Sequence, residues 1–366
     1  YLEQDSMIGA CATSALFSAF HQVSNMFQTH LPFPNKITIS AGMSFTEPNR
    51  ILPNRDGLDI LQVANTIDAL GLVAEIKSPE FDSWDKEHYN NRWLRAYLYA
   101  YLRLGIPIIL GFKLDNKSRL HAVTINGYRD INPDEFESSL KEFQRVEKEK
   151  RPLFTTAKLS YKQLLNKEQP LALKIHNLFK GKQPSGLILK SFFIERFYAH
   201  DDQIGPFSRL GFEGNDKILT AWWFGANPDE KMTASLHTII VPLENIIRIN
   251  FELVLSKIAE IDFWLKRKFQ TDALHCDLYL DYSNQYKKRL KESLSNHNFI
   301  DILIKPLPKY VWVAEYYSGN IKVFDIVFDS AEINETFFAT AIHFHNSYIK
   351  RHLNKLLQGI NLEDEL

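Results

Sequence analysis

Apolar residues recur at helical spacing in the first hundred positions of the chain. Leu16, Phe20 and Val23 share one face of the segment from Cys11 to Met26, with alanines on a neighbouring stripe, and this pattern predicts a helix. The same spacing predicts two further helices, at about residues 58–70 and 91–104.

The connection between the first two helices has a different composition. Residues 29–56 are rich in Pro, Asn and Thr and lack a helical period, which indicates a long loop with one short strand near residues 36–39. Asp56 is the expected cap of the second helix, and Gly71 is its expected stop. A long loop of this kind often shapes a binding cleft.

Continuous apolar runs predict strands after the third helix. Residues 106–114 and 120–128 are joined by a polar turn at 115–118, and they predict a hairpin that is buried on both faces. Strand character resumes at 187–198 and ends in the polar segment 200–206. Further strands are expected at about residues 218–224 and 236–242.

The pattern divides the chain into two α+β domains. The first covers residues 1–244 and contains a charge-rich helical insertion at about 132–186, for which a solvated lobe is the simplest interpretation. Residues 245–366 form the second, of unknown role. Its expected elements are helices at 251–269 and 284–294, a strand at 276–282, a hairpin of 309–317 with 322–328, and a terminal helix containing Lys350, Arg351 and Lys355.

Composition narrows the possible partners. The chain has 366 residues, 45% hydrophobic content and a formal net charge of -1, so charge gives no reason to expect nucleic acid or a membrane as partner. No apolar run reaches the roughly 18 residues that span a bilayer. Two cysteines cannot form a disulfide framework, which favours a cytoplasmic location. The chain begins with Tyr1 rather than Met, so a removed leader stays an open question.

Candidate chemistry centres on two segments. Cys11 begins the first helix, where free backbone N–H groups and the helix dipole stabilise a thiolate. His121 begins the return strand of the hairpin, and an imidazole within hydrogen-bond reach could pair with the thiolate and then protonate a leaving amine. Gln4 and the Cys11 backbone N–H are suited to hold an oxyanion.

The imidazole also needs an acceptor on its other nitrogen. Asn126 lies an odd number of positions from His121 on the same strand, so it faces the opposite way. Asp201, at the end of the next core strand, is the preferred candidate. Asp202 and Asp130 remain alternatives.

Other chemistry-bearing residues have simpler interpretations. Cys276 lies in a strand-like segment and is expected to be a core thiol. His343 and His345 lack further ligand types, and their surroundings fit an ordinary helix, so no metal site is expected. The pair Trp222 and Trp223 is expected to serve packing. A phosphate loop and a nucleotide fingerprint are both missing from the sequence, and no cofactor is expected.

Together, Gln4, the Gly9-x-Cys11 start of a small-residue helix, the His121-Ala-Val strand start and Asp201 resemble the papain-like cysteine peptidases. The bacterial branch that includes the bacteriocin-leader peptidases is the most similar. The resemblance covers about the first half of the chain, without the insertion. It implies a papain-like fold, a triad of Cys11, His121 and Asp201, and an oxyanion hole completed by Gln4.

The expected function is therefore hydrolysis of a peptide or isopeptide bond in a peptide or protein substrate, without a cofactor. Transfer of the acyl group to an amine, or deamidation of a glutamine, would use the same residues. Gln4 lies one position farther from the cysteine than is usual in the family, which favours a third hypothesis, a non-catalytic binding module. In that case the C-terminal domain is expected to recognise a protein partner.

Overall fold

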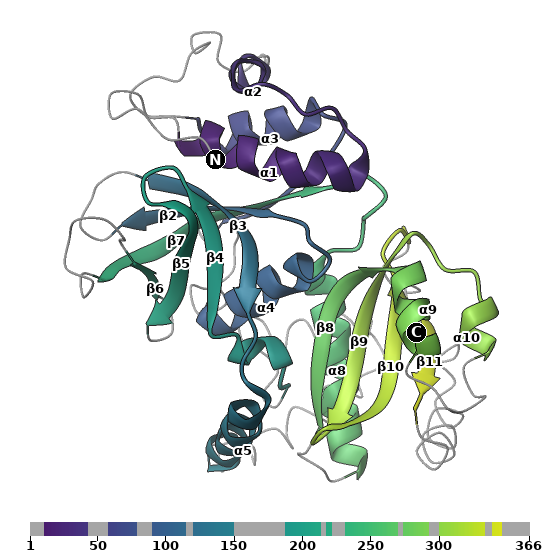
Figure 1. Cartoon of the computed structure of the whole chain (residues 1–366). Helices are drawn as coiled ribbons and strands as arrows, with labels where there is room; N and C mark the ends of the chain where they lie inside the picture. The colour runs from purple at the N-terminus through teal and green to yellow at the C-terminus, as the bar shows by residue number, and fades with distance from the viewer. Residues whose placement is uncertain are drawn as a thin grey trace, which may run out of the picture. The chain divides into compact units, whose positions relative to one another are not determined.

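The computed structural model describes ten parts of the chain, namely residues 11–42, 58–78, 90–114, 120–149, 187–213, 217–221, 231–269, 274–292, 300–333 and 339–345. The chain divides into two compact units. Unit 1 comprises Tyr1–Asp130 and Ile194–Ile247, and unit 2 comprises Ile131–Phe193 and Arg248–Leu366. Each has its own antiparallel sheet (Figure 1).

Unit 1 is built on one antiparallel sheet with the strand order β1-β7-β2-β3-β4-β5-β6. Because β6 also pairs with β7, the strands from β2 to β7 close into a barrel, while β1 extends the sheet beyond β7. The strands are β1 (Val73–Lys77), β2 (Ile108–Leu114), β3 (Leu120–Arg129), β4 (Arg196–Asp201), β5 (Gly205–Glu213), β6 (Lys217–Ala221) and β7 (Lys231–Leu243).

Three helices form a layer on the outside of this sheet (Figure 1). They are α1 (Cys11–Phe27), α2 (Pro34–Ala41) and α3 (Ile60–Asp68). The side chains of Leu16, Phe20 and Val23 on α1 are fully buried and belong to one core with Ile109 of β2 and Ile240 of β7. The helical stripe read from the sequence is therefore the face that packs on the barrel.

A buried hydrogen bond fixes α1 against β3. The hydroxyl of Thr124 donates to the backbone carbonyl of Ala15 at 2.5 Å, and Thr124 is 1% exposed. Ala15 lies one helical turn after Cys11, so this bond determines where the beginning of α1 meets the barrel.

The fourth helix of unit 1, α4 (Asn91–Leu102), is tied to β1 by buried tyrosines. The hydroxyl groups of Tyr97 and Tyr101 both donate to the carboxylate of Glu75. Asn90 caps the helix by accepting from the backbone N–H groups of Arg92 and Trp93. This aromatic helix is almost wholly buried, as its composition suggests.

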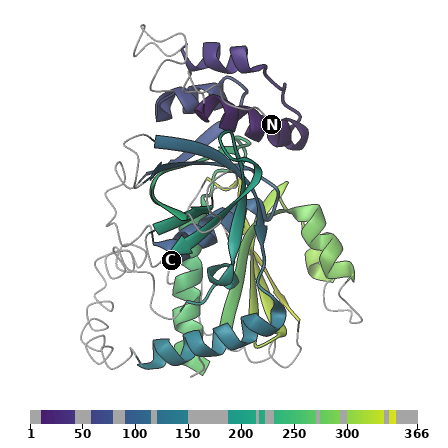
Figure 2. The same cartoon turned by 60° about the vertical axis from the view of Figure 1, so that its left-hand side comes forward.

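Unit 2 contains a second antiparallel sheet in the order β11-β10-β9-β8, covered by α8 on one face and α9 on the other (Figures 1 and 2). Its described elements are α5 (Pro133–Glu149), a 3-10 turn at Lys190–Phe193, α8 (Phe251–Phe269), β8 (Leu274–Tyr282), α9 (Ser283–Glu292), α10 (Ile300–Ile304), β9 (Tyr310–Ser318), β10 (Ile321–Asp329) and β11 (Ala339–Phe344).

The face toward α9 carries an unusual amount of buried charge. Asp277, Glu315, Asp325 and His343 lie directly opposite one another across the four strands, and all four are buried. The ammonium group of Lys322 lies 2.7 Å from Glu315 and 3.2 Å from Asp325. Buried carboxylates persist only when such partners compensate them.

Most predicted helices and strands are confirmed, with instructive exceptions. Residues 36–39 belong to α2 rather than to a strand. Pro34 occupies its first turn, and the burial of Ile37 and Thr38 outweighs their β-branched character. The cap of α3 is Asp59 rather than Asp56, because Asp59 and Gln62 form a capping box.

Strands β1 and β5 were not predicted, and the expected strand at 187–198 begins only at Arg196, after the 3-10 turn. His343 lies in β11, not in a helix. Other expectations fall outside the described residues: the loop at 43–57, the turn at 115–118, the helix at 164–179, Trp222, Trp223 and the terminal helix.

The helical insertion is grouped differently from the expectation. Its described parts belong to unit 2 rather than to the domain that contains Cys11. Two contacts explain this grouping: the carbonyl of Ile188 accepts from the backbone N–H of Cys276 at 2.9 Å, and the ring of Phe136 packs edge-on against His275. In the described part of the chain, no helix is long and apolar enough to cross a membrane.

Replacing Thr124 tests the attachment of α1. Thr124→Val keeps the shape but leaves the Ala15 carbonyl without its buried donor, so we expect the free energy of unfolding to fall by about 1–2 kcal/mol. Thr124→Ser keeps the hydroxyl and should lose less. Urea unfolding of the three proteins measures the difference, and a Thr124→Val variant as stable as the wild type would contradict the assigned role.

Candidate functional site

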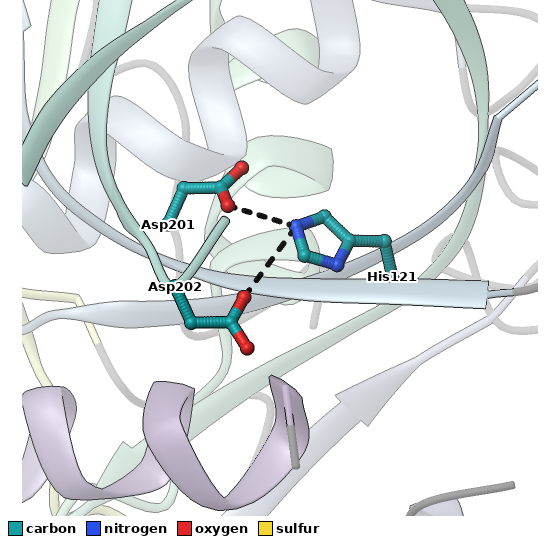
Figure 3. A group of neighbouring side chains, drawn as sticks. All are labelled: His121, Asp201 and Asp202. Carbon is teal, nitrogen blue, oxygen red and sulfur yellow. Dashed lines mark ion pairs between the residues drawn. The ribbon is translucent and has the colours of Figure 1, made fainter. Parts of the chain in front are cut away.

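The site forms where β3 begins and β4 ends. His121 is the second residue of β3, and Asp201 is the last residue of β4. Their side chains meet with the Nε2 of His121 3.1 Å from the Oδ1 of Asp201 (Figure 3). The side chains are 7% and 4% exposed, so the pair is shielded from water and its electrostatic attraction is strong.

A tight turn after β4 orients the Asp201 carboxylate. Its Oδ1 accepts the backbone N–H of Gln203 at 2.8 Å and of Ile204 at 3.2 Å. This arrangement is an Asx-turn, in which the side chain itself builds the turn. The carboxylate is therefore held in place by the connection to β5 before it meets the imidazole.

Asp202 supplies a second carboxylate at a longer distance. Its Oδ1 lies 3.9 Å from the Nε2 of His121, and Figure 3 shows both carboxylates directed at the same ring nitrogen. Burial raises the pKa of Asp202 to about 6, although the nearby His121 opposes this shift. Asp201 is the residue within hydrogen-bond distance, so geometry separates the two aspartates.

Cys11 interacts with the same imidazole from the beginning of α1. Burial alone would lower the pKa of His121, but the Asp201 carboxylate and, after it, the Cys11 side chain raise it to about 10. Cys11 is partly exposed and forms no disulfide. The raised pKa of the ring therefore depends first on the Asp201 carboxylate and then on Cys11.

Phe112 limits the orientation of the ring. It lies opposite His121 in the β2–β3 register, and its ring meets the imidazole edge-on with centroids 5.5 Å apart. It is 1% exposed. The strand pair that the sequence predicted as a buried hairpin therefore provides both the imidazole and the wall that supports it.

The other candidates have different environments. Gln4 lies outside the described residues. Asp130 follows the far end of β3, about nine residues and therefore roughly 30 Å along the strand from His121. Asn126 hydrogen-bonds to the ring of His200 at 2.9 Å, as its parity suggested. Cys276 is fully buried in β8, where burial raises its pKa well above the usual value.

These residues also raise the question of a metal ion. Among the described residues, His121, Asp201 and Asp202 form one group whose donor atoms lie within 4.8 Å of one another. A metal would need a neutral imidazole, whereas the surroundings hold the proton on His121. The Oδ1 of Asp201 also already accepts two backbone N–H groups. The donor set therefore fits a hydrogen-bonded pair of His121 and Asp201 better than a metal site.

Comparison with known proteins adds no further assignment, because no family model, curated protein or solved structure matches the chain. Inferences about function depend on the geometry above.

The raised pKa of His121 predicts a pH dependence of stability. The folded protein keeps the ring proton up to pH about 10, whereas the unfolded chain releases it near pH 6.5. The stabilisation is therefore complete below pH 6.5 and is lost as the pH rises to 10.

We expect the difference in unfolding free energy between wild type and His121→Asn to shrink by a few kcal/mol over this range, at about 1.4 kcal/mol per pKa unit. Urea unfolding at pH 6, 8 and 10 measures it. Cys11→Ser, which weakens one of the two partners, should show a smaller decline. A difference that grows with pH would contradict the protonated ring.

Proposed function

We propose that the protein is a cysteine hydrolase that cleaves peptide-type amide bonds through Cys11, His121 and Asp201. The proposal is carried by one observation: the buried His121 ring lies 3.1 Å from the Asp201 carboxylate, and the Cys11 side chain is among the groups that raise the pKa of the same ring. A thiol, an imidazole and an orienting carboxylate in this order are the parts required for nucleophilic catalysis.

The first half of the reaction forms a thioester. The Cys11 sulfur attacks the carbonyl carbon of the substrate, and the C–O π electrons move to the oxygen. Backbone N–H groups at the beginning of α1 lie free of helix partners and are suited to hold this oxyanion. Collapse of the intermediate breaks the C–N bond, and His121 gives its proton to the leaving amine.

The second half restores the enzyme. Neutral His121 takes a proton from water, the resulting hydroxide attacks the thioester carbon, and the C–S bond breaks to release the carboxylic acid. The sulfur leaves as a thiolate beside the protonated ring. Throughout, Asp201 holds the ring orientation through Nε2 and stabilises the imidazolium.

Two further features support the proposal. The order of helix, hairpin and aspartate along the chain agrees with the papain-like peptidases that the sequence resembles. In addition, α1 packs on a closed antiparallel barrel, the kind of scaffold on which a papain-like site would sit. We include Gln4 as a second oxyanion donor in this proposal, because the resemblance implies it.

The same thioester could react with an amine instead of water, giving a transferase, or it could form on a glutamine side chain and give a deamidase. A non-catalytic module that binds protein through unit 2 is the alternative outside enzyme chemistry. The buried imidazole beside the Asp201 carboxylate, with its raised pKa, favours catalysis.

Alkylation of Cys11 by iodoacetamide tests the activated thiol. An ordinary thiol is mostly protonated at pH 6 and substantially ionised at pH 9. We expect the wild type to react faster than His121→Ala by at least about tenfold at pH 6, and by much less at pH 9. Peptide mapping by mass spectrometry measures the rates, with buried Cys276 as the internal reference. A ratio near one at both values would overturn the proposal.

The two aspartates provide a matched pair of isosteric variants for this assay. Asp201→Asn removes the charge that is hydrogen-bonded to the ring, so the pH 6 rate should fall toward that of His121→Ala. Asp202→Asn removes the charge at 3.9 Å and should change the rate less. A larger effect of Asp202→Asn would transfer the orienting role to that residue.

Hydrolysis itself is tested with a library of unstructured peptides. We expect the wild type to cleave a subset of the library, with new carboxylate ends that carry oxygen from isotopically labelled water, and Cys11→Ser to leave it intact. Addition of hydroxylamine or a glycine amide distinguishes transfer from hydrolysis through the acyl acceptor in the product. Cleavage that persists in Cys11→Ser would contradict the nucleophile.

A further inference from the structure

Phe207 on β5 has an unusual conformation for a bulky residue. Its φ of 61° lies in the left-handed region, where a large side chain is strained. Within the described residues, Gln28 is the other non-glycine residue with a positive φ, and it directly follows α1, where left-handed residues commonly end helices. Phe207 has no such explanation, and its side chain is 64% exposed.

A bulge produces this conformation. The register between β4 and β5 shifts by one residue, so Pro206 and Phe207 both lie opposite His200. Bulges redirect side chains and are frequent beside active sites. Here the Phe207 ring meets the His200 ring edge-on, with centroids 5.5 Å apart. The side-chain amide of Asn126 on β3 hydrogen-bonds to the His200 ring at 2.9 Å. The ring against which Phe207 packs is therefore itself held in place.

The pair lies near the nucleophile. His200 is adjacent in sequence to Asp201 and is the cross-strand neighbour of Thr124, whose hydroxyl holds Ala15 of α1. Cross-strand neighbours are about 5 Å apart and one helical turn rises about 5.4 Å. Phe207 therefore lies within roughly 20 Å of Cys11, a distance that an extended peptide spans in about six residues.

We propose that Phe207, supported by His200, is a substrate-binding subsite that takes an apolar or aromatic side chain of the peptide. This inference rests on the proposed function, since it places the subsite within reach of an extended peptide whose carbonyl is attacked by Cys11. Holding a large aromatic ring in water on a strained backbone costs free energy. Contact with an apolar side chain of the substrate recovers part of that free energy. Burial lowers the pKa of His200, so the supporting ring is neutral at pH 7.

The test compares two sizes of electrophile. Iodoacetamide is too small to reach from Cys11 to Phe207, whereas peptidyl chloromethyl ketones of two to six residues that end in glycine cover the distance. Each peptide is made with either Phe or Ala at each upstream position in turn. The proteins are the wild type, Phe207→Gly, Phe207→Tyr and, as a control for another exposed phenylalanine, Phe33→Ala. Glycine adopts the φ of residue 207 without strain, so this variant is expected to fold.

At one upstream position, we expect the wild type to react at least about tenfold faster with the Phe peptide than with the Ala peptide. The ratio should approach one in Phe207→Gly and be retained in Phe207→Tyr and Phe33→Ala, while all four proteins react equally with iodoacetamide. An unchanged ratio in Phe207→Gly, a wild-type ratio near one at every position, or an equal loss in Phe33→Ala overturns the subsite.

Failure of the proposed function gives a different result. In that case the wild type and His121→Ala react with iodoacetamide at the same rate at pH 6. The thiol is then not activated, and the peptide rates carry no information about a subsite. A subsite that fails alone leaves the dependence on His121 intact and removes only the selectivity among peptides.

Discussion

The packing of α1 on β3 is the constraint on which unit 1 depends. The helix brings Leu16, Phe20 and Val23 into one core with β2 and β7, and the bond from Thr124 to the Ala15 carbonyl sets its position along the strand. Cys11 begins this helix and His121 nearly begins this strand. The contact that buries the core therefore also sets where the beginning of α1 lies on the strand that carries His121, so stability and geometry at the site are coupled.

Local pattern in the sequence was enough for much of this arrangement. The apolar stripe of α1 and the pairing of β2 with β3 follow directly from the spacing of apolar residues. The odd separation of Asn126 from His121 also correctly predicted that the two side chains face opposite ways. The pairing of Asp201 with His121 also follows from the sequence, because the end of a neighbouring strand lies beside the beginning of the previous one. The choice between Asp201 and Asp202 needed the Asx-turn, whose geometry no pattern of residue types specifies.

The misses have a shared physical origin in long-range contacts. Strand β1 has five residues, which are too few to show a clear strand pattern in the sequence. It is a strand because it pairs with β7. The segment 36–39 has the composition of a strand, yet burial against α3 makes it helical. The bulge that turns Phe207 outward depends on pairing with β4. In the second sheet, charged and apolar residues alternate along the strands. This alternation alone does not reveal that α8 and α9 bury both faces of the sheet.

Both units are discontinuous along the chain, and this has a consequence for synthesis on the ribosome. Strand β2 pairs with β7, which emerges more than a hundred residues later, so the barrel cannot close until Leu243 has left the exit tunnel. The segment 131–193 must likewise wait for the C-terminal part to which it belongs. Non-local pairing of this kind delays folding. Cys11 is thus translated early, whereas the strands that surround the beginning of α1 are completed only after much of the chain has been made.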